Sequence, residues 1–272
     1  MARITKAERK IMTQIDDLIY GTDRPLTFDE KYFVLENFNP AFYTDNSYLG
    51  AFFTPIEFVR DFYVTEIGNT RKVIDLCAGI GGLTFFSANN CIREERAKQI
   101  TCVEYNSRHV EIGKRILPEA DWICGDALTY NDDYRYDLVV SNPPFGKIKT
   151  GDNENSGLLY TGSEFEFKII ECGAKFADQG AFIAIASSFP WRYDKRGCYE
   201  PLDSVSKYNK FHNDTGIILH CSGNIDCSIY DNEWIGTKVS TDVCFVDYTE
   251  GYKGYSKPEP VVKSDDPFGF LE

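Results

Sequence analysis

The sequence predicts an α/β fold: a Rossmann-like, doubly wound, mostly parallel sheet with a C-terminal antiparallel hairpin and an N-terminal helical extension. Three observations predict it. Short β-branched or apolar runs recur from Arg71 onwards, helix-like stretches separate them, and a glycine-rich turn follows the first run. Strands that alternate with helices at this spacing are typical of βαβ units, which require a parallel sheet.

The N-terminal segment is expected to be helical. Residues 4–20 place isoleucine and leucine at helical spacing and stop at Gly21, and a second short helix is predicted over 27–37, before Pro40. We expect the first helix to pack on the rest of the domain rather than to contact nucleic acid.

The main sheet is expected to contain five successive strands. These are KVIDL (72–76), QITCVEY (99–105), ADWICGD (120–126), YDLVVSNPP (136–144) and GAFIAIAS (180–187). Helices are predicted over 105–116 and 163–177, and an irregular stretch over 189–215. Two further strands follow, TGIILHC (215–221) and STDVCFVDY (240–248), and the second is expected to pair with EWIGTKVS (233–240) as a hairpin.

Composition limits the possible classes of protein. The 272 residues are 43% apolar, which is enough for a core without disulfides. A net charge of −13 argues against a protein that coats polyphosphates, although it permits a local basic patch. The nine cysteines are odd in number and lack a CxxC pair, so we expect reduced thiols and no metal site. The charged start and the lack of a long apolar run predict a cytoplasmic protein with no membrane partner.

The first strand leads into a glycine-rich turn. It ends at Asp75, and the turn over 76–82 allows the backbone to approach a ligand closely beyond the strand ends. Glu104 ends the second strand, where a carboxylate can accept hydrogen bonds from ribose hydroxyls. The turn alone suits a dinucleotide enzyme equally well, but Thr84 replaces the third glycine of that pattern. Asp75 either faces the ligand or braces the turn.

The fourth strand ends in Asn142-Pro143-Pro144-Phe145. The two prolines fix φ twice and remove two amide donors, so this corner offers acceptors and few donors. The side-chain oxygen of Asn142 and the Pro143 carbonyl can each accept one N–H of a planar amine, while Phe145 stacks on its ring. The alternative is an irregular strand exit with a buried phenylalanine, which the ordered glycine turn and Glu104 make less favourable.

With these motifs, residues of about 50–190 resemble the S-adenosylmethionine-dependent adenine-N6 DNA methyltransferases. GAFFTP (50–55) is similar to the FxTP element of that family, DLCAGIGG (75–82) to its cofactor loop, and VEYN (103–106) to its ribose-binding acid. GDAL (125–128) resembles the element that binds the cofactor's adenine, and NPPF (142–145) the catalytic motif. FxTP before the glycine loop and NPPF after it is the gamma-class order. Two departures are the short chain after GAFIAIAS, where the family has a target-recognition domain, and the acidic charge.

The resemblance implies transfer of a methyl group from S-adenosylmethionine to N6 of adenine, in DNA of a restriction–modification system and by base flipping. The implied catalytic residues are Asn142, Pro143, Pro144 and Phe145. The implied cofactor-binding residues are Phe53, Thr54, Pro55, Asp75, Cys77, Ala78, Gly79, Gly81, Glu104, Tyr105, Asp126, Ala127 and Asn142. Phe52 or Phe53 could offer a π face to the sulfonium. The alternatives are methylation of RNA adenine or of a protein glutamine, and a cofactor-binding subunit that recruits a partner without catalysis.

Basic and aromatic residues alternate over 190–212, which predicts a DNA-contacting segment, with a solvated loop as the alternative. The candidate nucleic-acid-binding residues are Lys147, Lys149, Trp191, Arg192, Lys195, Arg196, Lys207 and Lys210. His109 is expected at the surface. The predicted units are the extension (1–45), a methyltransferase domain (46–250) with a substrate-facing insertion (189–215), and a tail (251–272). DNA is the expected partner, and a second protein could supply target recognition.

Overall fold

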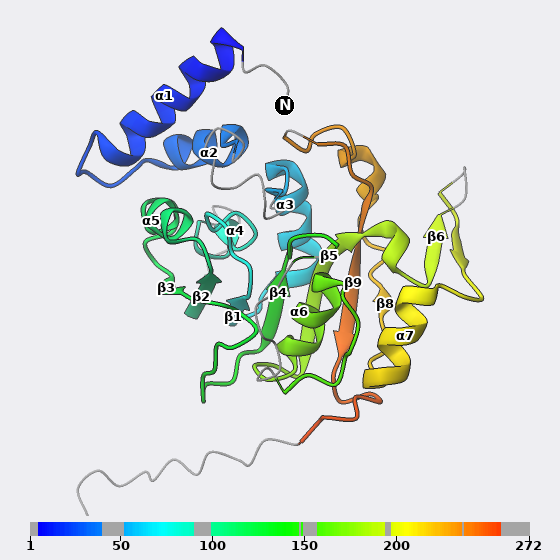
Figure 1. The fold of residues 1–272 in the computed structure, drawn as a ribbon. Helices are drawn as coiled ribbons and strands as arrows, with labels where there is room; N and C mark the ends of the chain where they lie inside the picture. The colour runs from blue at the N-terminus through cyan, green and yellow to red at the C-terminus, as the bar shows by residue number, and fades with distance from the viewer. Residues whose placement is uncertain are drawn as a thin grey trace, which may run out of the picture.

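The structure, a computed structural model, describes residues 5–39, 52–89, 99–146, 148, 157–193, 197–235 and 237–256. In this part of the chain a seven-stranded sheet runs through the middle of the molecule, between two groups of helices (Figure 1). In spatial order its strands are β3 (Asp121–Cys124), β2 (Gln99–Glu104), β1 (Lys72–Asp75), β4 (Leu138–Ser141), β5 (Gln179–Ile185), β9 (Thr241–Asp247) and β8 (His220–Cys221).

The first five strands run parallel, and β9 lies antiparallel between β5 and β8. This confirms the predicted fold class, a mostly parallel α/β sheet. The central strands are short apolar runs that are buried on both faces, as the fully buried β4 shows, whereas β3 and β8 at the two edges are partly exposed. A separate antiparallel hairpin joins β6 (Trp191–Tyr193) to β7 (Tyr199–Pro201).

Seven α-helices lie in the described residues. They are α1 (Lys6–Tyr20), α2 (Phe28–Asn37), α3 (Ile56–Phe62), α4 (Phe85–Ala88), α5 (Ser107–Ile116), α6 (Phe165–Gly173) and α7 (Ser206–Thr215). The first two begin at capping boxes, in which a threonine and a glutamate three residues later bond each other's backbone N–H. These caps explain why both predicted N-terminal helices form.

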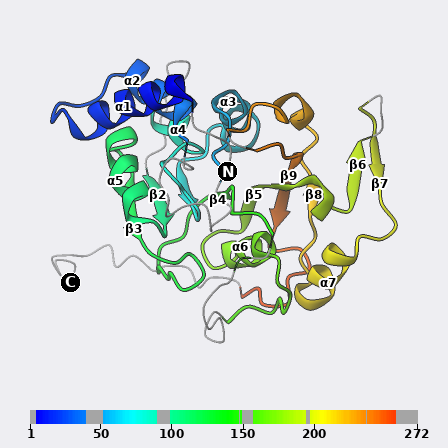
Figure 2. The same cartoon turned by 45° about the horizontal axis from the view of Figure 1, so that its top comes forward.

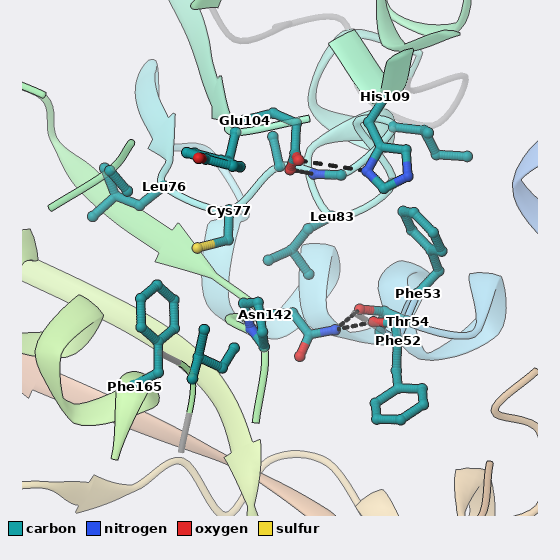
Figure 3. Close-up of a pocket in the computed structure, with 18 of the residues that line it drawn as sticks. Phe52, Phe53, Thr54, Leu76, Cys77, Leu83, Glu104, His109, Asn142 and Phe165 are labelled. Atoms are coloured by element: carbon teal, nitrogen blue, oxygen red, sulfur yellow. Dashed lines mark hydrogen bonds and ion pairs between the residues drawn. The ribbon is translucent and has the colours of Figure 1, made fainter. Parts of the chain in front are cut away.

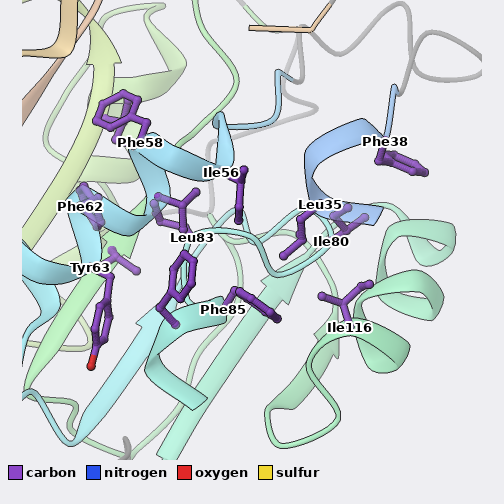
Figure 4. Close-up of a cluster of buried hydrophobic side chains, with 14 of the residues drawn as sticks. Leu35, Phe38, Ile56, Phe58, Phe62, Tyr63, Ile80, Leu83, Phe85 and Ile116 are labelled. Carbon is purple, nitrogen blue, oxygen red and sulfur yellow. The ribbon is translucent and has the colours of Figure 1, made fainter. Parts of the chain in front are cut away.

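The two faces of the sheet carry separate cores. Successive residues of a strand point to opposite faces, so Val140 joins one buried cluster and Val139 the other. The first cluster packs beneath α1 to α5 and is rich in phenylalanine, including Phe58 and Phe62 of α3 (Figure 4). Full burial of each such side chain contributes roughly 1.5–3 kcal/mol. The second cluster packs beneath α6 and α7.

The two N-terminal helices share the first core. Met12 and Ile15 of α1 and Val34 of α2 are buried in the same cluster as the strand residue Val73. The guanidinium of Arg115, on α5, donates hydrogen bonds to three backbone carbonyls at and after the end of α1. The first helix is therefore packed on the domain. The chain divisions at 45/46 and 250/251 stay predictions.

Two expectations about the C-terminal third are wrong. The strand β9 does not form a hairpin with residues 233–240, because β5 and β8 occupy its two edges. The stretch 189–215 is not irregular throughout, because it contains the β6–β7 hairpin and the helix α7. Figure 2 shows the hairpin beyond β8, at the end of the sheet opposite α1 and α2.

The parallel strands end at one edge of the sheet, where the predicted motifs lie. Because β1, β2, β3 and β4 are neighbours in space, the loops that follow them meet there. Among the described helices, none has both the length and the apolar character that a bilayer span needs. The same residues contain no group of three His, Cys, Asp or Glu side chains arranged to hold a metal ion.

Candidate active site

A cavity of about 240 Å³ lies at the carboxyl ends of β1 to β4 (Figure 3). It is lined by eleven of the predicted site residues: Phe53, Thr54, Cys77, Ala78, Gly79, Glu104, Tyr105, Asp126, Ala127, Asn142 and Pro144. The predicted residues Pro55, Asp75, Gly81, Pro143 and Phe145 are not part of its lining. Residues from five separate motifs are therefore brought to one cavity.

The glycine turn forms one wall of the cavity and requires its glycines. Gly79 and Gly81 have φ of 57° and 87°, which L side chains rarely adopt. A Cβ on Gly79 would lie 2.5 Å from Cε1 of Phe53. The ring of Phe53 thus sits directly on the turn, and only a residue without a side chain allows this approach.

Glu104 joins the turn to the end of β2. Its Oε2 accepts a hydrogen bond from the Gly79 N–H at 2.8 Å, and its Oε1 accepts one from the Asn106 N–H at 2.8 Å. Each carboxylate oxygen can accept further bonds, because an ionised carboxylate offers about four acceptor positions. The side chain therefore braces the loop and still presents acceptors to a ligand in the cavity.

His109 is a site residue that the sequence reading placed wrongly at the surface. Its side chain is 3% exposed and lines the cavity, with Nδ1 3.4 Å from Oε1 of Glu104. The ring meets Phe53 edge-on, with centroids 5.3 Å apart. The helical spacing of the sequence could have predicted this burial. His109 lies three and seven residues before the buried Ile112 and Ile116, so the three side chains share one face of the helix.

Asp75 lies beneath the turn rather than in the cavity. It is fully buried, its Oδ1 accepts the Cys77 N–H at 3.3 Å, and its Oδ2 has no hydrogen-bond partner among the described residues. Burial raises the pKa of Asp75 to about 8, and the nearby charge of Glu104 acts in the same direction. Of the two roles considered for this carboxyl, the contact with Cys77 favours bracing of the loop.

Asp126 follows β3 and lines the cavity beside Ala127. Its Oδ1 accepts the Leu128 N–H at 2.9 Å, which fixes the carboxylate in a tight turn. The turn itself is attached to the second strand, because the Gly125 N–H donates to the Glu104 carbonyl at 3.0 Å. A rigid acidic turn after β3 therefore completes the wall opposite the glycine loop.

Asn142 has an oriented side-chain amide. Its Nδ2 donates to the Phe52 carbonyl at 3.1 Å and to Oγ1 of Thr54 at 2.9 Å (Figure 3). A carbonyl oxygen can only accept, so the amino half of the amide must face Phe52 and the oxygen must face away. That oxygen, Oδ1, is buried and has no hydrogen-bond partner in the described part of the chain. The amide therefore presents an unused acceptor.

Aromatic side chains surround the corner after Asn142. The ring of Phe145 stacks against Phe52 with centroids 6.2 Å apart and planes inclined by 28°. Trp234 meets Phe145 at 67° with centroids 6.1 Å apart, and is 3% exposed. No motif surrounds Trp234 in the sequence, so only the folded chain reveals its place beside Phe145.

The candidate nucleic-acid-binding residues fall into three groups: one is buried, three are exposed, and four lie outside the described residues. Trp191 is 2% exposed, stacks on Phe189 and donates from Nε1 to Oδ2 of Asp242 at 2.7 Å, so the expectation that it meets nucleic acid is wrong. It was misplaced because basic residues follow it in the sequence, whereas the bond that holds its indole comes from Asp242 on a distant strand. Four candidates lie outside the described residues: Lys147, Lys149, Lys195 and Arg196.

Three basic candidates are exposed. Arg192 pairs with Glu200 across the β6–β7 hairpin, with Nε and Oε2 2.9 Å apart. Lys210, on α7, pairs with Asp214 at 3.0 Å, and Lys207 lies on the same helix. Exposed ion pairs of this kind contribute little to stability, so the cations remain available to a stronger anionic partner.

Comparison with known proteins agrees with the position of this site. Residues 58–157 match the family model "Methyltransferase small domain". A tRNA1(Val) (adenine(37)-N6)-methyltransferase of Enterobacter sp. (strain 638) is 25% identical over 129 residues, which are 44% of this chain and 51% of that protein. The type II methyltransferase M.CvrRI of Paramecium bursaria Chlorella virus XZ-6E is 26% identical over 138 residues, 50% of this chain and 35% of that protein. The chain thus matches about half of the first relative and a third of the second.

A solved structure shows the same fold. A chain from a type I R-M system has a TM-score of 0.55 and 16% identity, and the match covers 90% of this chain and 51% of that one. The sheet has the order and strand directions of the class I S-adenosylmethionine-dependent methyltransferase fold. The cavity fits such a cofactor, because Glu104 offers carboxylate acceptors and the glycine turn offers close backbone approach. The chain therefore has the fold of the class I S-adenosylmethionine-dependent methyltransferases, and its residues 58–157 match a methyltransferase family model.

Proposed function

We propose that the protein transfers a methyl group from S-adenosylmethionine to the exocyclic N6 of adenine, in DNA. One observation carries the proposal. Among the described residues, the Oδ1 of Asn142 is buried without a hydrogen-bond partner, while its Nδ2 is held by Phe52 and Thr54. A buried polar atom without a partner costs about 1–3 kcal/mol, so an acceptor kept in this state is suited to a ligand that brings an N–H.

The amine of adenine is a weak nucleophile, because its lone pair is delocalised into the ring. If Oδ1 of Asn142 accepts one N–H and the Pro143 carbonyl accepts the other, the nitrogen moves toward a tetrahedral form with a localised lone pair. The prolines at 143 and 144 lack amide donors that could compete for these acceptors. The chain therefore activates the amine by hydrogen bonding. The N–C bond would form as the S–C bond of the cofactor breaks, and the methylated nitrogen, now cationic and strongly acidic, would release its extra proton to water.

The bound cofactor supplies an electrophilic methyl group on a positively charged sulfur. In this chain Glu104 would accept bonds from the ribose hydroxyls, Asp126 would meet the adenine amino group, and the glycine turn would lie against the cofactor. Phe53 and Thr54, which also belong to the predicted cofactor set, line the same cavity. Holding both reactants in line is the main source of acceleration available here.

A base within a duplex cannot reach this corner, so the target adenine must be flipped out of the helix. Stacking on Phe145 would offset part of the unpairing cost, which is a few kcal/mol. Arg192, Lys207 and Lys210 are the described cations that we assign to phosphate contacts. Because the net charge is −13, we propose that a protein partner supplies target recognition.

RNA adenine is the second candidate substrate. It is favoured by the 25% identity to a tRNA adenine-N6 methyltransferase, which covers 44% of this chain. The chemistry at Asn142 is the same for both nucleic acids, since the exocyclic amine is identical. Contacts beyond the base must distinguish them.

The test is a transfer assay with methyl-labelled S-adenosylmethionine and three separate acceptors: duplex DNA, transfer RNA and protein. Digestion of the labelled product to nucleosides identifies the methylated atom. Labelled N6-methyldeoxyadenosine supports the proposal. Label in RNA alone would show that RNA adenine, the second candidate, is the substrate. Label in glutamine, or cofactor binding without any transfer, rejects adenine methylation and leaves the protein-modifying or recruiting alternatives.

A further inference from the structure

A buried carboxylate holds the far end of the Asn142–Gly146 corner. Glu166, in the first turn of α6, is completely buried. Its Oε2 accepts the N–H of Gly146 at 3.0 Å, and the preceding residue, Phe165, donates its own N–H to the Gly146 carbonyl at 2.9 Å. Two consecutive residues of one helix therefore bind both backbone groups of the glycine that follows Phe145.

The other oxygen of Glu166 reaches a second strand exit. Oε1 accepts the hydroxyl of Ser188 at 3.1 Å, and Ser188 is also completely buried, in the turn that follows β5. The carboxylate thus bridges the chain leaving β4 and the chain leaving β5. A buried carboxylate is costly unless its oxygens are bonded, and both of these are.

The corner is short and stiff, so its two ends determine its shape. At one end Asn142 is held by Phe52 and Thr54. The two prolines that follow have φ fixed by their rings. At the other end Gly146 has φ of 84°, and in the described part of the chain a Cβ built there meets no atom within 4 Å apart from its chain neighbours. Packing therefore does not restrain Gly146 in the way that the hydrogen bonds from α6 do.

We infer that Glu166 is a positioning residue for methyl transfer, which fixes Phe145 and the Pro143 carbonyl through the backbone of Gly146 and does not touch the substrate. The inference rests on the proposed function of the corner. It extends the site by a residue that belongs to none of the motifs and does not line the cavity.

The same helix supplies a matched control. Glu171 is also completely buried in α6, and it accepts the N–H groups of Leu159 and Tyr160 at 2.6 Å and 2.9 Å. Its loss removes a buried carboxylate that accepts two backbone N–H groups and the Tyr252 hydroxyl, whereas the loss of Glu166 removes one that accepts one backbone N–H and the Ser188 hydroxyl, at a different loop. A purely structural role for Glu166 predicts that the two variants behave alike.

The kinetic test compares Glu166→Ala, Glu166→Gln and Glu171→Ala. Displacement of a reacting group by 1 Å can lower the rate by about 100-fold, so we expect Glu166→Ala to lose about that much kcat. The Kd of S-adenosylmethionine should change by less than about threefold, because no cofactor-facing atom is altered. Glutamine can accept from Gly146 and donate to Ser188, so Glu166→Gln should recover kcat to within about fivefold of the wild type. Glu171→Ala should retain kcat.

The inference is overturned if Glu166→Gln is as slow as Glu166→Ala, or if Glu171→Ala loses as much kcat. Hydrogen exchange of the Gly146 amide adds a measurement that needs no substrate and that can be made on the wild type alone. The Gly146 amide of the wild type should be protected despite its place in a loop, and Glu166→Ala should remove that protection. A freely exchanging Gly146 amide in the wild type overturns the inference even if Glu166→Ala does not fold. If the wild type methylates no adenine, the proposed function fails, and amide exchange still decides whether Glu166 holds the corner.

Discussion

Removal of the hydroxyl of Thr54 tests how the amide of Asn142 is oriented. Thr54→Val keeps the shape of the side chain but deletes the acceptor that lies 2.9 Å from Nδ2 of Asn142. The Phe52 carbonyl, at 3.1 Å, then remains as the acceptor for that amino group. A neutral hydrogen bond contributes about 0.5–1.5 kcal/mol, and 1.36 kcal/mol corresponds to a tenfold change in rate. If the bond serves only to orient the amide, the rate of methyl transfer should fall by about 2- to 13-fold.

The assay is single-turnover transfer from labelled S-adenosylmethionine to the accepted nucleic acid, with the Kd of the cofactor measured in parallel. The parallel measurement is needed because Thr54 also lines the cavity. Thr54→Ser is the matched control, since it restores the acceptor and loses only a methyl group. A wild-type rate in Thr54→Val, or an equal loss in Thr54→Ser, would refute the account of the amide.

Three further perturbations test other parts of the site. Asn142→Ala should abolish methyl transfer, and Phe145→Ala should reduce its rate by a smaller factor. Calorimetry should find S-adenosylmethionine binding preserved in both variants. A wild-type rate of transfer in Asn142→Ala contradicts the role assigned to that residue. Arg192→Ala and Lys207→Ala should each weaken DNA binding and lower the slope of log K against log salt by about 1, and an unchanged slope places the phosphate contacts elsewhere. Burial raises the pKa of Asp75 from 3.8 to about 8. Between these values the folded state binds the extra proton, so wild-type stability should fall relative to Asp75→Asn as the pH rises from 5 to 8, by at most about 1.4 kcal/mol per pH unit. Denaturant unfolding of both proteins at pH 5 and pH 8 checks this. If the free energy of unfolding changes equally with pH in the two proteins, the pKa of Asp75 is not raised.

Much of the fold could be predicted because its signals are local. Apolar runs such as 72–76 mark strands through their own residues, and Thr5 and Thr27 mark helix starts through bonds that span three residues. The glycine turn and the NPPF corner were also predictable, since glycine and proline restrict the backbone directly. The eleven predicted residues that line the cavity were assigned through the resemblance of these motifs to a known family.

The remaining features depend on contacts between distant parts of the chain. The partners of β9 could not be inferred from adjacency, because β5 precedes it by more than fifty residues and still pairs along its whole length. Trp191 was misplaced for the same reason, since Asp242 on that strand binds its indole N–H. Glu166 and Trp234 carry no motif, and only packing brings them to the corner.

The hydrogen bonds that orient the amide of Asn142 come from groups 90 and 88 positions earlier in the chain. A nascent or partly unfolded molecule can already possess β4 and its two prolines, yet its acceptor oxygen has no defined direction until the segment before α3 docks. The corner therefore acquires an oriented acceptor only after residues 52–54 and the end of β4 have met, so the geometry of the site depends on the joining of two distant parts of the polypeptide.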